Sequence, residues 1–132
     1  MMRYFLDTSI IIAYLRQKQP TADSVDQLDG ELFSSFICLS ELYEGIAYAK
    51  ERKRAEEAVL GFFQGLAGIF SIDSDTARRF GYLRAHLKAR GEVLEDIDTF
   101  IAATCLSQNT TLVTLNVRHF KRVPDLLLYT IP

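Results

Sequence analysis

The chain has 132 residues, of which 48% are apolar, and its formal net charge is −2. A chain of this length can bury roughly two thirds of its unfolded surface, and no linker or repeat divides it, so we expect a single domain over residues 1–132. The longest apolar run, residues 10–15, is far shorter than the ~20 residues of a membrane span. Because Asp7 also interrupts any secretory signal, we expect a cytoplasmic protein.

Short apolar segments alternate with helical segments along the whole chain. We predict strands at residues 3–6, 31–36, 68–72, 110–115 and 125–130. We predict helices at residues 10–17, 21–30, 39–49, 51–68, 74–91 and 97–106. This alternation predicts an α/β fold, in which a mainly parallel sheet of about five strands carries helices on both faces. The segment 97–106 is apolar almost all round, so we expect this helix to be central.

The basic residues are unevenly spread, although the net charge is negative. Most of the 15 Lys and Arg residues fall in four runs, at residues 50–54, 78–79, 84–90 and 118–122. Taken alone, each run has the composition of a solvated helix face. The alternative is a phosphate-binding role, which requires that several runs surround one pocket.

Four polar residues flank the predicted buried elements. Asp7 directly follows the first strand and Asn116 follows the fourth, and ligands of parallel sheets bind beyond the carboxyl ends of the strands. Asp98 begins the central helix, and Glu41 lies in the first turn of the helix after the second strand. Each has a simpler role when taken alone: a helix cap, a favourable place in the helix dipole, an exposed helix position or a turn. Together they favour a shared site at one sheet edge.

Carboxylates gathered within ~5 Å raise one another's pKa unless a cation neutralises them. Oxygen ligands without His or Cys suit Mg²⁺ or Mn²⁺. His86 and His119 lie in basic runs, and Cys38 and Cys105 have the apolar surroundings of buried free thiols, so we do not expect zinc. A magnesium ion held by few carboxylates keeps several waters and handles phosphate oxygens. With basic runs nearby, the pattern predicts a metal-dependent enzyme that cuts phosphodiester bonds.

The motifs "FLDTSIII", "LSELYEGI", "DTFIAATC" and "TLVTLNVRHFKRV" occur in this order along the chain. In order and spacing the chain resembles a PIN-domain ribonuclease, and more narrowly the VapC-type toxin of a toxin–antitoxin pair, from Arg3 to about Tyr129. The resemblance implies a PIN-like three-layer fold with an acidic pocket that binds Mg²⁺ or Mn²⁺. It also implies hydrolysis of structured RNA of the tRNA or rRNA class, leaving a 5′-phosphate and a 3′-hydroxyl.

By position, the resemblance implies a catalytic set of Asp7, Glu41, Asp98 and Asn116, with Asp7 and Asp98 as the metal ligands. Asn116 stands where members of this family carry Asp or Asn, and its neutral oxygen argues against a tightly held second metal. Asp96 is a candidate for compensating this lost charge, and capping of the following helix is the alternative.

Further residues are candidates for the surroundings of the site. Possible pocket or supporting residues are Thr8, Ser9, Asp96 and Thr114. Possible contacts to RNA phosphates are Arg118, His119, Lys121 and Arg122, which follow the fourth strand at the same sheet edge. His119 has the alternative of packing beside Phe120.

The resemblance also implies partners: a cognate antitoxin, and a homodimer that forms a larger complex with it. Residues 33–48 are richer in aromatic and aliphatic side chains than one strand and one helix require. A plain core explains most of them, and a groove for a partner helix is the alternative.

Rival functions remain at this point. A phosphoryl-transfer enzyme of the haloacid-dehalogenase type also begins with a strand-end Asp, but it needs a second Asp where this chain has Ser9. A phosphoacceptor receiver needs another acid beside Asp7, where this chain has Thr8, and a late Lys that is missing after the fourth strand. The other alternative is a catalytically weak PIN-like scaffold that binds nucleic acid or a partner.

Overall fold

The computed structural model describes residues 1–132. Five strands form one sheet in the order β3-β2-β1-β4-β5, and every neighbouring pair is parallel. The strands are β1 (Met2–Leu6), β2 (Gly30–Ser35), β3 (Gly68–Phe70), β4 (Thr111–Val113) and β5 (Leu128–Tyr129). The predicted α/β class with a parallel sheet of about five strands is confirmed.

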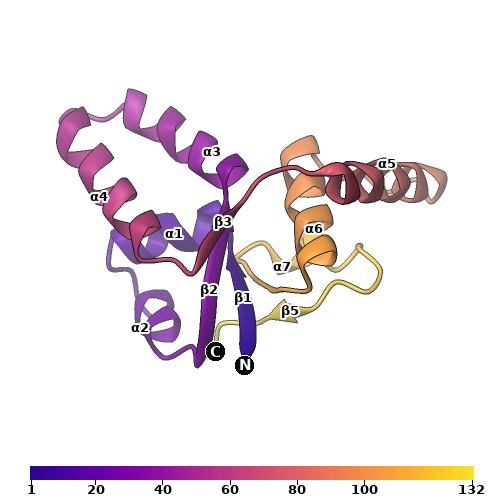
Figure 1. Cartoon of the computed structure of the whole chain (residues 1–132), viewed down its shortest axis with the longest axis horizontal. Helices are drawn as coiled ribbons and strands as arrows, with labels where there is room; N and C mark the ends of the chain where they lie inside the picture. The colour runs from indigo at the N-terminus through magenta and orange to yellow at the C-terminus, as the bar shows by residue number, and fades with distance from the viewer.

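Seven helices cover the two faces of this sheet (Figure 1). One group consists of α1 (Thr8–Leu15), α2 (Thr21–Asp26), α3 (Phe36–Ala47) and α4 (Arg52–Gln64). The other group consists of α5 (Ser74–Ala89), α6 (Asp96–Gln108) and the short α7 (Val117–Phe120). None of these helices combines the length and the apolar character that crossing a membrane requires.

Side chains of the central strands alternate between two hydrophobic cores. Tyr4 and Leu6 of β1 belong to the core beneath α1 to α4, whereas Phe5 between them belongs to the core beneath α5 to α7. Because successive strand residues point to opposite faces, a strand covered on both faces is apolar throughout. The helix α6 supplies Ile101, Ala102 and Cys105 to the second core, which confirms its predicted central place.

The carboxyl ends of β1 and β4 lie side by side in the middle of the sheet. Leu6 pairs with Val113 in the parallel register, so the next residues, Asp7 and Thr114, leave the sheet at the same edge. Segments far apart in the sequence therefore meet where the chain passes from strand to helix. This edge is the one at which parallel sheets bind their ligands.

The structure moves several predicted boundaries. Gly30 begins β2 and does not end a helix; a Cβ there would clash with the Met2 carbonyl oxygen across the β1–β2 pair. Asp73, just before the predicted start of this helix, caps α5, because its carboxylate accepts from the Thr76 amide at 2.8 Å. The hydroxyl of Ser35 accepts from the Cys38 amide and starts α3 at Phe36, so Glu41 lies in its second turn and not in its first.

Both cysteines are buried and free, as predicted. Burial raises the pKa of the Cys38 thiol to about 11, and it also raises the pKa of the Cys105 thiol. At neutral pH each therefore remains a protonated thiol, which is inert as a nucleophile and as a metal ligand.

Candidate active site

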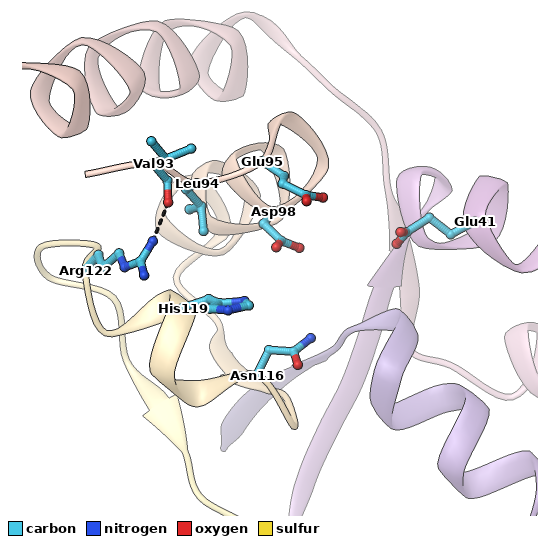
Figure 2. Close-up of a pocket in the computed structure, with 8 residues that line it drawn as sticks. All are labelled: Glu41, Val93, Leu94, Glu95, Asp98, Asn116, His119 and Arg122. Carbon is cyan, nitrogen blue, oxygen red and sulfur yellow. Dashed lines mark hydrogen bonds between the residues drawn. The ribbon is translucent and has the colours of Figure 1, made fainter. Parts of the chain in front are cut away.

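A hollow of about 440 Å³ opens at the carboxyl edge of the sheet. It is lined by Glu41, Val93, Leu94, Glu95, Asp98, Asn116, His119 and Arg122, from three separate parts of the chain (Figure 2). We call it the acidic pocket, because three of the lining residues carry carboxylates. The predicted convergence of Glu41, Asp98 and Asn116 is present in this arrangement.

The carboxylates come from two helices that face each other. Asp98 lies in the first turn of α6 and Glu95 occupies the N-cap position of that helix, where the helix dipole favours negative charge. Glu41 extends from α3 on the opposite side, and its carboxylate points toward the other two across the pocket (Figure 2). No hydrogen bond joins Asp98 to another residue that lines the pocket.

The charge of Asp98 is therefore uncompensated by a close partner. Its partial burial raises the pKa of the carboxyl above the ordinary value, and the negative charges of Asp7, Glu41 and Glu95 raise it further. His119 acts in the opposite direction. A group with a raised pKa and several acidic neighbours in a cleft is a typical functional-site candidate.

Asp7 lies behind the pocket and does not line it. The side chain is 3% exposed, and it caps α1 by accepting from the Ile10 amide at 3.1 Å. The Ser9 hydroxyl donates to the same carboxylate at 2.6 Å, and the Thr114 hydroxyl donates to its other oxygen. Burial raises the pKa of Asp7 most, the hydrogen bonds lower it, and the charge of Glu41 raises it. The capping role that the sequence left open is present.

Hydroxyl groups hold the other polar parts of the site in place. The Thr8 hydroxyl donates to Oε1 of Glu41 and so links α1 to α3. The Ser9 hydroxyl accepts from the Leu115 amide at 3.2 Å, and the Thr114 hydroxyl accepts from the Asn116 amide at 3.0 Å. The predicted supporting residues Thr8, Ser9 and Thr114 thus connect Asp7 and Glu41 to the segment that carries Asn116.

The basic side of the pocket is formed by His119 and Arg122. Both are exposed, and both lie on the segment that follows β4. The Arg122 guanidinium donates to the Val93 carbonyl oxygen across the pocket wall (Figure 2). His119 is exposed while Phe120 beside it is fully buried, so the alternative in which His119 packs into the core is wrong. Arg118 and Lys121 do not line the acidic pocket.

Asp96 occupies a different place from the one predicted. It is the first residue of α6, one residue before the predicted start of this helix, and it forms an ion pair with Arg84 of α5. Asp96 does not line the acidic pocket, and it makes no capping hydrogen bond. Residues two apart on a helix point in different directions, which separates Asp96 from Asp98.

Glu95 is the pocket carboxylate that sequence reasoning missed. The segment "EVLEDID" holds several acids in a row, and the sequence does not indicate which of them face the pocket. Val93 and Leu94 were missed as well, because their apolar side chains gave no chemical signal. The place where α6 begins decides the matter, since Glu95 falls at its N-cap position.

The donor set fits a hard divalent cation in chemistry. The pocket offers carboxylate oxygens from both sides and an amide oxygen from Asn116, which are ligands that suit Mg²⁺ and Mn²⁺. Repulsion from the neighbouring acids raises the pKa of Asp98, and a bound cation would relieve this repulsion. No group of three or more His, Cys, Asp or Glu side chains is close enough to form a ready-made metal site in this conformation.

The apolar side chains of residues 33–48 divide between the core and the surface. Phe33, Leu42 and Ile46 are core residues, whereas Tyr43 and Tyr48 are exposed on or just after α3. A largely apolar hollow of about 480 Å³ instead lies between α1, α2 and α4, with Tyr14, Leu15, Val25, Leu28, Phe62 and Leu66 among its lining residues. We call it the apolar groove.

Comparison with known proteins agrees with this fold and pocket. The model of the PIN domain family matches residues 4–126. Ribonuclease VapC2 of Rickettsia felis is 31% identical over 131 residues, which is 96% of each chain.

Two solved structures resemble the whole molecule. One is VapBC2 from Rickettsia felis bound to a DNA fragment from their promoter, with a TM-score of 0.88 and 27% identity over 97% of this chain and 98% of that one. The other is VapBC-1 from nontypeable Haemophilus influenzae, with a TM-score of 0.84 and 30% identity over 97% of both chains.

Proposed function

This chain belongs to the PIN domain family, and we propose that it is an endoribonuclease that depends on Mg²⁺ or Mn²⁺. It would be the toxin of a type II toxin–antitoxin pair. Relatives that are named ribonucleases and match nearly the full chain support this activity. The substrate class is structured RNA of the translation machinery, that is, tRNA or ribosomal RNA.

One observation carries the proposal. Carboxylates of α3 and α6 face each other across one pocket, and a histidine and an arginine close the same pocket from the other side. Such a pocket can hold a cation at its acidic side and a phosphate at its basic side. A rival fold with a lone strand-end Asp would not need this second set of groups.

In the proposed site, Asp98 would hold the metal from within the pocket and Asp7 would hold it from behind. A bound Mg²⁺ or Mn²⁺ polarises phosphate oxygens and lowers the pKa of nearby water. Asn116 offers a neutral oxygen at the pocket wall. Asp7 also holds the start of α1 and the end of β4 together, since its carboxylate accepts from both Ile10 and Thr114.

Glu41 is the proposed proton acceptor. Its Oε1 receives the hydrogen bond of Thr8, which leaves Oε2 free to take a proton from the attacking water. Oxygen from that water forms a bond to phosphorus as the bond from phosphorus to the 3′ oxygen breaks. Once the leaving 3′ oxygen has gained a proton, the products are a 5′-phosphate and a 3′-hydroxyl.

His119 and Arg122 are the proposed phosphate contacts within the pocket. Arg122 donates a hydrogen bond to the Val93 carbonyl oxygen, which is neutral. The positive charge of Arg122 therefore stays available to a phosphate. Arg118 and Lys121 lie outside the pocket and can reach only other phosphates of the substrate.

The partner is proposed to be a cognate antitoxin, as in the VapBC complexes that this chain resembles. We propose that an apolar helix of the antitoxin lies in the apolar groove between α1, α2 and α4, where most of the large apolar lining side chains are only partly buried. A single domain over residues 1–132, a homodimer that joins a larger complex with antitoxin, and a cytoplasmic location complete the proposal.

The test uses two matched substitutions, Asp98→Asn in the first turn of α6 and Asp75→Asn in the first turn of α5, with bacterial total RNA, Mg²⁺ and mapping of new 5′ ends. Loss of groups that merely support metal ligands costs roughly 10- to 100-fold, so Asp98→Asn should reduce cleavage by at least about 100-fold. Asp75→Asn should cleave at the wild-type sites. Wild-type cleavage by Asp98→Asn, or cleavage that EDTA leaves unchanged, would contradict the proposal.

A further inference from the structure

A second hollow adjoins the acidic pocket, and basic residues dominate its lining. It has a volume of about 440 Å³ and is lined by Arg90, Glu92, Lys121, Arg122 and Pro124. We call it the basic hollow. Arg90 ends the basic run 84–90, and Lys121 and Arg122 end the run 118–122. Two runs that are distant in the sequence therefore meet around one hollow. This is the arrangement that a phosphate-binding role requires.

Arg122 lines both the acidic pocket and the basic hollow. Its guanidinium donates to the carbonyl oxygen of Val93, which also lines the acidic pocket. This bond holds the cation at the boundary between the two hollows without neutralising it. A chain that leaves the acidic pocket past Arg122 enters the basic hollow directly.

The basic hollow carries a net positive charge. Its three cations face one carboxylate, Glu92, which accepts from Nε of Arg90 at 2.8 Å. Neither Lys121 nor Arg122 takes part in any of the ion pairs of the molecule. Arg90 is largely exposed, and its other donor groups remain open to the hollow. Exposed cations of this kind are the groups that bind RNA phosphates.

We infer that the basic hollow binds the backbone phosphates of the RNA strand next to the scissile bond. The RNA would run from the acidic pocket, past Arg122, to Lys121 and Arg90, between the end of α5 and the end of α7. This inference rests on the proposed nuclease function. It gives the substrate a direction over the surface and adds Arg90, which comes from a different run than the pocket residues do.

The alternative path along the run 50–54 is excluded by position. That run lies at the start of α4, in the helix group on the other face of the sheet from α5, α6 and α7 (Figure 1). Arg52 and Lys53 are exposed and form no ion pair, just as Lys121 is exposed and unpaired. They therefore provide a matched control with the same loss of charge.

The test compares the double variant Arg90→Gln/Lys121→Gln with the control Arg52→Gln/Lys53→Gln. Neither pair lines the acidic pocket, so the catalytic groups remain in place. Binding is measured by fluorescence anisotropy with a fluorescein-labelled single-stranded RNA of mixed sequence, in EDTA and over a range of salt concentrations. Cleavage of bacterial total RNA in Mg²⁺ is measured in parallel.

Each lost phosphate contact lowers the slope of log affinity against log salt by about 0.7 for a single strand, so two lost contacts lower it by about 1.4. We expect this change in the hollow variant, together with a raised KM and a little-changed kcat. The control should keep the wild-type slope. In RNAs shortened from one side of the cleavage site, the difference between the hollow variant and wild type should vanish.

A wild-type slope in the hollow variant, or an equal reduction in both variants, would overturn the inference. An unchanged RNA affinity together with weaker binding of an acidic peptide would instead assign the hollow to a protein partner and would also overturn it. Failure of the nuclease proposal looks different, since the wild type would then not cleave RNA at all.

Discussion

Carboxylates at the two ends of α6 have opposite surroundings and opposite shifts in pKa. Near its C-terminal end, the Ser107 hydroxyl donates to Asp75 at 2.6 Å, and Arg78 and Arg79 pair with the same carboxylate. These partners hold the pKa of Asp75 well below its usual range. At its N-terminal end, Asp98 faces Glu41 and Glu95, and its pKa is raised.

This difference distinguishes a structural carboxylate, Asp75 of α5, from a functional one, Asp98 of α6. A carboxylate with a full set of partners joins α5 to α6 and stays charged at any ordinary pH. A carboxylate with acidic neighbours and no close donor costs stability when it is charged, and only a bound cation removes this cost. The unfavourable end is the one that opens into a pocket, as expected where function opposes stability.

The largest effect should come from removing the charge of Glu41, which faces α6 across the acidic pocket. Glu41→Gln should lower kcat for RNA cleavage by about 100-fold or more, because the proposed proton acceptor is lost, with a smaller change in KM. Glu44→Gln, on an exposed position of the same helix, serves as the control and should retain wild-type kcat. Equal kcat in both variants would remove Glu41 from the mechanism.

The second prediction concerns the cation. Mg²⁺ at ten times its dissociation constant should stabilise the wild type by about 1.4 kcal/mol, which thermal melting detects as a rise of several degrees. Asp98→Asn should melt at the same temperature with and without Mg²⁺. Asp75→Asn should keep the full response, since its partners are Ser107 and two arginines.

The third prediction concerns the stability of the metal-free protein at neutral pH. Asp75→Asn should lower Tm by a few degrees, because it weakens the link between α5 and α6. Asp98→Asn should leave Tm unchanged or raise it, because it removes an uncompensated charge from a half-buried site. Scanning calorimetry of the two variants in EDTA measures both, and a larger drop for Asp98→Asn would reverse the comparison.

The smallest effect is the pH dependence, and its sign differs between the two ends. The folded-state pKa of Asp98 is raised. Ionisation of this group therefore lowers the free energy of unfolding as pH rises above about 4 and through the folded-state pKa. The pKa of Asp75 is lowered, so its contribution is present above about pH 4 and is lost as pH falls further. Urea unfolding in EDTA should show the advantage of Asp98→Asn growing toward neutrality and the deficit of Asp75→Asn shrinking in acid.

Much of the site could be predicted, because each element carries a local signal. Asp7 follows an apolar strand, and Asp98 begins an apolar helix, so their places at element ends follow from hydrophobic pattern alone. The position of Glu95 could not be predicted in this way, since a difference of one residue in the start of α6 changes which acid faces the pocket. Asp96 illustrates the same limit, because its partner Arg84 lies on another helix.

The sequence by itself determined the alternation of strands and helices, the two-sided burial of the sheet and the set of acids at its carboxyl edge. Apolar spacing and caps act over a few residues, so they can be read without coordinates. Only the tertiary structure decided that Asp7 sits behind the pocket with three donors, that Glu95 faces Glu41, and that Arg90 meets Lys121. These outcomes depend on how elements distant in the sequence pack together. The rings of Phe80 in α5 and Phe100 in α6, stacked with their centroids 3.9 Å apart, are one such contact between residues that no local pattern relates.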